Sequence, residues 1–273
     1  MNHTHLLIYS AIFVTLGMTS CDNTTTYVTT VPKMAAEGLN LEAVTDLATK
    51  VKTPQEFEEK LNKPGNLINN LDLNEDEIVD FIKITEINDE TGKGFSLSTE
   101  VAPNDEQELA VIQFEEQEGN AVVQAHGNSH LYGNHHYYHR SYGLTDLLIW
   151  NYYLGGHRRY SSPYGYNNHP SYFQSQSTRS ASKYSNHHKS QAYTKGFTQT
   201  TRPAVSKSLT SPNRNKTATQ IKAPLRNPTT SQKKYQLSNP SKSRPKPKSN
   251  SFSSSKYRSS SSSRSRSSFG GGK

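Results

Sequence analysis

Oxygen-bearing side chains recur at alternate positions in the stretch LDLNEDEIVDFI, residues 71–82. They fall at positions 1, 3, 5 and 9 of a possible calcium loop, where such side chains supply ligands: Asp72, Asn74, Asp76 and Asp80. Position 6 of such a loop is normally glycine and position 12 an acid, but here they are Glu77 and Lys83. Two interpretations stay open: a weak calcium site, or a solvated acidic turn before a strand, with Asp76 and Asp80 on its outer face.

Histidines form a second group that could bind a metal. They are concentrated in one short segment: His126, His130, His135, His136 and His139. Neutral imidazole is a common ligand for zinc, copper and nickel. The spacings match no closed four-ligand site, and no His-Glu-x-x-His pattern occurs. The segment is therefore either an aromatic-rich surface loop or a nonspecific metal-binding tract.

The residue patterns of the common catalytic sites do not occur in this sequence. It contains no Gly-x-Ser-x-Gly motif, no Walker loop and no dinucleotide-binding fingerprint. Adjacent acids occur at Glu58-Glu59 and Glu115-Glu116, and such pairs in an acidic module usually lie on a solvated face. We therefore expect a protein that is not an enzyme, with calcium as its one possible cofactor.

The residues around the single cysteine indicate a cellular address. Residues 6–18 form an apolar run that is too short to span a bilayer but suits the core of a secretory signal. The run ends in Met18-Thr19-Ser20-Cys21, which resembles the bacterial lipobox, whose cysteine is acylated. We expect a signal peptide at 1–20 and a lipid anchor on Cys21, although an ordinary secretory signal with a chance cysteine is the alternative. A lone cysteine also excludes an internal disulfide framework.

Charge divides the chain into two parts. Residues 1–146 contain all 23 acidic residues and eight basic ones, a net charge of −15, whereas residues 147–273 contain 23 basic residues and no acid. This split predicts an acidic folded module followed by a basic tail. In an exported protein the partners of that tail would be anionic lipids, lipopolysaccharide or acidic wall polymers, and nucleic acid is not expected.

Hydrophobic periodicity predicts a small α+β domain at residues 40–127, after a tether at 21–39. Helical spacing favours a helix over 41–51 capped by Asn40, and a second helix begins at Thr53-Pro54 and ends at Lys63-Pro64-Gly65. Alternating patterns separated by short turns predict four strands: 79–87, 95–101, 108–114 and 121–127. We expect an antiparallel β-meander covered on its apolar face by the two helices.

Composition changes twice beyond the predicted domain. Residues 128–173 are rich in Tyr, His and Gly and include one apolar stretch, 144–154, with the only tryptophan, Trp150. That stretch is interpreted as a short core helix or as a segment lying in a membrane interface. Residues 174–273 are rich in Ser, Thr, Asn, Lys and Arg, and we expect them to form a long disordered basic tail.

Several of these features together resemble a group of uncharacterised bacterial envelope lipoproteins. The features are the lipobox, the Asp-x-Asn-x-Asp ladder leading into a β-meander, the Leu131-Tyr132-Gly133-Asn134 segment and the basic Ser/Arg/Gly-rich end. The resemblance implies an architecture and a location, and no activity. Our hypothesis is a non-enzymatic, membrane-anchored envelope lipoprotein whose basic tail contacts anionic polymers or folds back onto the acidic module. The alternatives are a Ca²⁺- or Zn²⁺-binding envelope module, or a cytosolic nucleic-acid-binding protein if the signal interpretation is wrong.

Overall fold

The computed structural model describes residues 35–134, 136–191 and 196–239. The expected signal peptide, Cys21 and most of the tether therefore lie outside the described residues, as do His135 and the chain after Asn239. The elements in chain order are η1 (Ala35–Gly38), α1 (Leu41–Thr49), α2 (Pro54–Asn62), β1 (Lys83–Asp89), β2 (Gly92–Ala102), β3 (Asp105–Gln117), β4 (Asn120–Gly127), α3 (Ser129–Tyr132), β5 (Tyr137–Gly143), η2 (Leu144–Asp146), α4 (Trp150–Leu154), α5 (Ala181–Lys189), β6 (Thr198–Thr200) and α6 (Thr230–Ser238).

One six-stranded sheet organises the described chain. Its strands follow one another in sequence order, β1-β2-β3-β4-β5-β6, and every neighbouring pair is antiparallel. The predicted α+β class and antiparallel meander are thus confirmed. The sheet has two strands more than predicted, because the Tyr/His-rich segment supplies β5 and the expected tail supplies β6.

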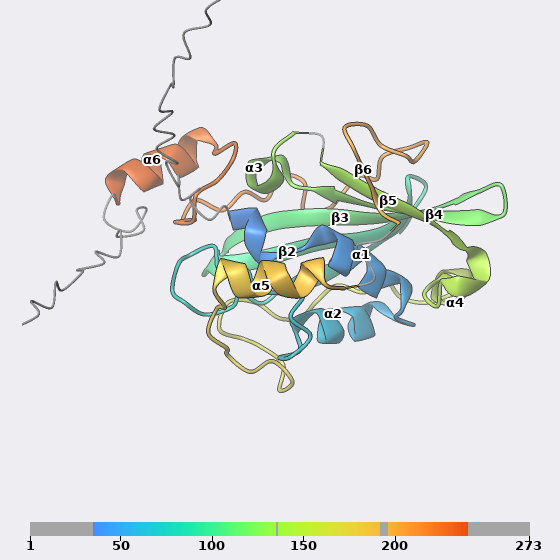
Figure 1. Cartoon of the computed structure of the whole chain (residues 1–273), viewed down its shortest axis with the longest axis horizontal. Helices are drawn as coiled ribbons and strands as arrows, with labels where there is room; N and C mark the ends of the chain where they lie inside the picture. The colour runs from blue at the N-terminus through green and yellow to red at the C-terminus, as the bar shows by residue number, and fades with distance from the viewer. Residues whose placement is uncertain (1–34, 135, 192–195, 240–273) are drawn as a thin grey trace, which may run out of the picture. The chain divides into compact units, whose positions relative to one another are not determined.

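Two helices on one side of the sheet begin at the predicted caps. The Asn40 side chain accepts a hydrogen bond from the Ala43 backbone N–H at 2.8 Å, and the Thr53 hydroxyl accepts one from the Glu56 N–H at 3.1 Å. Both bonds satisfy backbone donors that the first turn of a helix leaves without partners. Helix α1 packs on β4 and α2 packs on β1, and α5 lies on the same side (Figure 1).

Strand β2 alternates as its sequence predicts. Phe95 and Leu97 are fully buried beneath the helices, and Phe95 packs against the Phe57 ring of α2 at 5.2 Å between centroids. Ser96 and Ser98 point to the opposite face and are also fully buried. A serine on the second face of a sheet is buried only when another layer covers it.

That second layer is residues 196–239, which we call the strap. The prediction of disorder over 174–273 does not hold for the described part of that range, because α5, β6 and α6 form there and Val205, Ala218 and Ile221 are buried. The strap crosses β2 and β3 through polar groups, and a few of its apolar residues join the hydrophobic core: Ala218, Ile221, Ala223 and Leu225. These few apolar residues stand in a segment of mostly polar composition, and hydrophobic periodicity does not detect the polar contacts.

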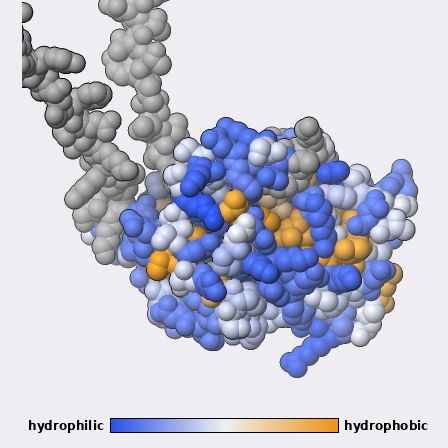
Figure 2. Space-filling view, turned by 60° about the horizontal axis from the view of Figure 1, so that its bottom comes forward, coloured by the Kyte–Doolittle hydropathy of each residue, from blue (hydrophilic) through white to orange (hydrophobic). Residues whose placement is uncertain are grey.

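The apolar stretch 144–154 closes one end of the core. Leu147, Ile149 and Tyr153 are buried, and the Tyr153 hydroxyl donates to the Gly94 carbonyl at 3.0 Å. Leu148 and Leu154 are 43% and 67% exposed, so only one side of the stretch packs inward. Across the face shown in Figure 2, hydrophobic surface is interspersed with hydrophilic surface. Among the described residues, no helix has the length and hydropathy needed to cross a bilayer.

Candidate functional site

The acidic loop at 72–80 is closed by hydrogen bonds to its own backbone. The Asp72 carboxylate accepts from the backbone N–H groups of Asp76 and Glu77, at 3.2 and 3.1 Å, and the Asp76 carboxylate accepts from that of Ile78 at 2.9 Å. Glu75 and Glu77 have φ values of 54° and 69°, a left-handed conformation that costs a residue with a Cβ about 1–2 kcal/mol. Glu77 thus adopts a positive φ where a calcium loop has glycine.

Asp80 does not lie on the outer face, as the solvated-turn interpretation required. Its side chain is buried and accepts a hydrogen bond from the Leu73 backbone N–H at 2.7 Å. Burial, reinforced by the charges of Asp72 and Asp76, raises the pKa of Asp80 well above its ordinary value. The predicted first strand also starts later, at Lys83, because the backbone N–H groups of Asp80 and Ile82 donate to the Leu71 carbonyl and the Asn62 side chain instead of pairing with β2.

The described histidines of the tract have separate roles on two strands and a short helix. The His126 ring stacks on Tyr137 with the centroids 4.3 Å apart, His130 contacts the Asn227 carbonyl, and His139 pairs with Gln124 across β4 and β5. His136 Nδ1 lies 3.2 Å from the Asn134 carbonyl oxygen. In the described ranges, no group of three or more His, Cys, Asp or Glu residues is arranged to hold a metal ion.

Glu58 and Glu86 form a buried carboxylate pair bridged by one residue. The Tyr160 hydroxyl donates to Glu58 at 2.9 Å, and the Tyr160 backbone N–H donates to Glu86 at 2.9 Å. Glu86 also accepts from the Tyr152 hydroxyl at 3.2 Å and contacts His157 Nε2 at 2.7 Å. Burial raises the pKa of Glu58, whereas the bond to Glu86 raises that of His157. These bonds hold residues 152–160 over β1.

Glu58 was expected on a solvated face, and it is fully buried instead. A signal for this was present in the sequence. Pro54, Phe57, Glu58 and Leu61 lie at helical spacing, so Glu58 shares the inward side of α2 with Phe57 and Leu61.

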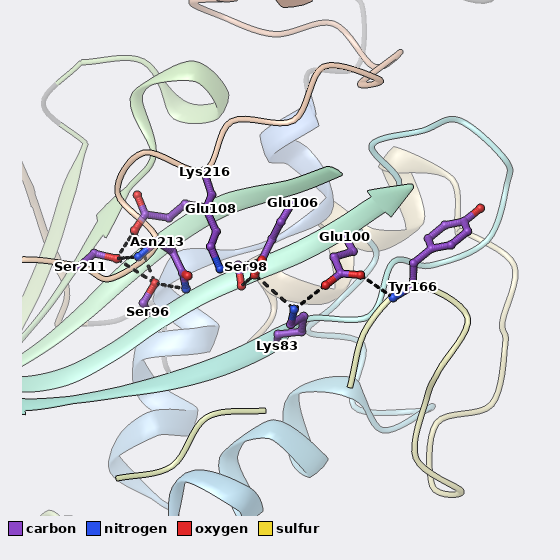
Figure 3. Close-up of polar contacts among 10 residues, drawn as sticks. All are labelled: Lys83, Ser96, Ser98, Glu100, Glu106, Glu108, Tyr166, Ser211, Asn213 and Lys216. Atoms are coloured by element: carbon purple, nitrogen blue, oxygen red, sulfur yellow. Dashed lines mark hydrogen bonds and ion pairs between the residues drawn. The ribbon is translucent and has the colours of Figure 1, made fainter. Parts of the chain in front are cut away.

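The strap docks on the sheet along a row of polar contacts whose residues we call the polar seam. Figure 3 shows its members: Lys83, Ser96, Ser98, Glu100, Glu106, Glu108, Tyr166, Ser211, Asn213 and Lys216. At one end, the Ser211 hydroxyl bonds both to Glu108 and, at 2.9 Å, to the Ser96 hydroxyl. The Asn213 side chain donates to the same Ser96 oxygen at 2.9 Å. This cluster of small polar groups covers Ser96, whereas the Ser98 hydroxyl donates to Glu106 at 2.6 Å.

The other end of the polar seam is charged. Lys83 Nζ lies 2.7 Å from a Glu100 oxygen and 3.4 Å from Glu106 Oε1, while Lys216 Nζ lies 2.7 Å from Glu106 Oε2 (Figure 3). Burial alone would raise the pKa of Glu106, but bonds from Lys216 and Ser98 and the charge of Lys83 lower it below its ordinary value. The carboxylates are therefore matched by cations within the protein, and the seam is a docking surface for the strap.

Elsewhere along the strap, acidic residues of the sheet are held by uncharged donors. The Asp105 carboxylate accepts from the backbone N–H groups of Thr219 and Gln220, at 2.9 and 2.8 Å. The Glu115 carboxylate accepts from the Ser206 N–H at 2.9 Å. The strap thus neutralises few of these acids with its own cations.

Most strap cations consequently lie at the surface. The strap contains eight basic residues and no acid: Arg202, Lys207, Arg214, Lys216, Lys222, Arg226, Lys233 and Lys234. Of these eight strap cations, only Lys216 forms an ion pair within the described residues. All of them except the half-buried Lys222 are exposed. These strap cations are the strongest candidate for a functional surface that the described chain presents.

Comparison with known protein families, curated proteins and solved structures found no match for this chain. The functional argument therefore depends on the residues and the geometry described above.

Proposed function

We propose that this protein is a non-enzymatic, membrane-anchored lipoprotein of the bacterial envelope, which binds anionic envelope polymers through its strap and the residues that follow it. The observation that carries the proposal is the way the strap docks, through hydroxyl, amide and backbone donors that leave its cations at the surface. A strap held by ion pairs would have its charges consumed by the acidic sheet.

The distribution of charged residues along the sequence supports the same proposal. The described ranges contain 22 acidic and 20 basic residues and are close to neutral, while residues 240–273 add nine basic residues and no acid. Each Lys or Arg close to an anionic membrane surface contributes about 1 kcal/mol, so even partial engagement of these cations would give stable binding. The lipobox ending in Cys21 would place them beside such a surface.

Co-sedimentation with lipopolysaccharide tests the proposal, with three forms of the protein compared at increasing salt. The intact chain should sediment, and its binding should weaken steeply as salt rises, because screening acts on exposed charges. A chain ending at Asn239 should bind more weakly. A full-length chain with Arg202, Lys207 and Arg214 replaced by Gln should also bind more weakly than the intact chain.

The matched control is replacement of Lys52, Arg158 and Arg159 by Gln. It removes the same charge from exposed positions outside the strap, and it should bind nearly as the intact chain does. Equal losses in the control and strap variants would mean that only net charge matters. Undiminished binding by the chain ending at Asn239 and by the strap variant would contradict the proposal.

A further inference from the structure

A half-open pocket of about 800 Å³ lies between α5, η1, the start of α1 and strand β5. Its volume is within the range of about 300–1,000 Å³ found for small-molecule sites. It is separate from the polar seam, and none of the residues that dock the strap on β2 and β3 lines it. It therefore needs an explanation other than strap docking.

The apolar wall of the pocket is fixed by bonds that the chain makes elsewhere. The Tyr132 hydroxyl donates to the Leu39 carbonyl at 2.9 Å, and the Tyr184 hydroxyl donates to the Ile68 carbonyl. Leu39 and Leu41 also line this wall. The wall is thus already rigid, which lowers the entropic cost of receiving a ligand.

The polar groups of the pocket converge on a third tyrosine. Burial raises the pKa of the Tyr138 hydroxyl; the charge of Glu42 raises it further, and the charge of Arg226 lowers it. Within the described ranges Tyr138 makes no side-chain hydrogen bond, and Glu42 and Arg226 form no ion pair with one another.

One negative and one positive group therefore border the same pocket without neutralising each other. Glu37 and Lys189 repeat this pairing of signs among the lining residues. Burial raises the pKa of Glu42, so its carboxylate would gain from a cationic partner. An ammonium group would also be attracted by the faces of nearby aromatic rings.

We propose that this pocket binds a zwitterionic ligand with an apolar side chain, a short peptide or a free amino acid. Its ammonium group bonds to Glu42, its carboxylate bonds to Arg226, and its side chain packs against the rings of Tyr132 and Tyr184. Charge complementarity carries this assignment, because a ligand of one charge would leave the opposite wall unmatched. The proposal shares Arg226 with the strap cations and does not otherwise depend on polyanion binding by the strap.

Calorimetry with four probes and the intact chain tests the assignment. The probes are Phe-Phe, free phenylalanine, N-acetyl-Phe-Phe and Phe-Phe amide. Hydrogen bonds to charged groups contribute about 1.5–3 kcal/mol, so blocking either end of the dipeptide should weaken binding roughly tenfold or more. Tighter binding of Phe-Phe than of phenylalanine identifies a peptide, and the reverse identifies an amino acid.

Two variants connect each end of the ligand with its residue. In Glu42→Gln, acetylation of the probe should cause no further loss of affinity, whereas amidation should still weaken binding. In Arg226→Gln, amidation should cause no further loss of affinity, whereas acetylation should still weaken binding. Glu118→Gln and Arg158→Gln, exposed positions outside the pocket and outside the strap, are the matched controls and should behave as the intact chain does. No heat from either free probe at millimolar concentration, or equal affinity for the free and blocked dipeptides, would overturn the proposal.

Discussion

Lys216 and Glu106 are 110 positions apart in the chain and form an ion pair, with Lys216 Nζ 2.7 Å from Glu106 Oε2. The other oxygen of Glu106 lies 3.4 Å from Lys83, which also binds Glu100. One carboxylate thus joins the first strand of the sheet to the strap. The two lysines differ in exposure, at 14% for Lys83 and 45% for Lys216.

This difference predicts unequal effects of removing the two charges. Lys216→Met should lower the free energy of unfolding by no more than about 1 kcal/mol, the usual contribution of an exposed pair. Lys83→Met should lower it by about 3 kcal/mol, because two poorly exposed carboxylates lose their shared cation. Urea unfolding of both variants measures the difference, and equal losses would contradict this account of the seam.

Asp80 should make the domain less stable as pH rises. Its pKa is raised in the folded state, so the folded protein holds this proton more tightly than the unfolded chain does. The free energy of unfolding should therefore fall as pH rises above about 4, the ordinary range of the group, toward the raised pKa. Asp80→Asn should flatten that fall and leave stability at pH 4 nearly unchanged. Unfolding curves at several pH values measure it, and an unaltered pH slope in the variant would refute the prediction.

Glycine should suit position 77 better than glutamate does. Glu77 has a φ of 69°, so Glu77→Gly removes a left-handed strain, although glycine also costs some entropy on folding. A net gain of about 0.5–1 kcal/mol is expected. Glu59→Gly, within α2, is the control and should destabilise by about 1 kcal/mol. Thermal unfolding compares the two, and destabilisation by Glu77→Gly would show that the loop does not carry this strain.

Gly94 should tolerate no side chain, because the backbone of the neighbouring strand β3 lies against it. A Cβ there would meet the Ile112 carbonyl oxygen and lie 2.5 Å from a methyl carbon of Leu209. Gly94→Ala should cost about 1–3 kcal/mol, as overpacked sites do. Gly156→Ala, where a Cβ would meet nothing within 4 Å, is the control. If Gly94→Ala unfolds at the same urea concentration as the control, β2 and β3 do not approach one another this closely at Gly94.

The sequence predicts those parts of the fold that depend on local patterns. Asn40 and Thr53 cap the two helices as expected, and the alternation of Phe95, Ser96, Leu97 and Ser98 is observed in β2. These features depend on neighbours a few positions away, which a single sequence displays directly.

The strap could not be predicted in this way. Ser211 bonds to Ser96, 115 positions earlier, and Thr219 bonds to Asp105, 114 positions earlier. Hydrogen bonds between small polar side chains leave no periodic signature, so a polar segment that docks on polar strands has the composition of a disordered one. The pocket beside Tyr138 was missed for a related reason, since η1, α5 and β5 meet only in the folded chain.

Lipidation of Cys21 is the most direct test of the central claim that this is an anchored envelope lipoprotein. The intact mass and membrane fractionation of the wild type and of Cys21→Ser, both expressed in a bacterial host, should be compared. We predict a wild-type mass that corresponds to cleavage before Cys21 with acyl chains attached, and release of the variant from the membrane. An unmodified chain that keeps Met1 and stays in the cytosol would contradict the account, and it would make nucleic acid the first partner to test for the basic strap.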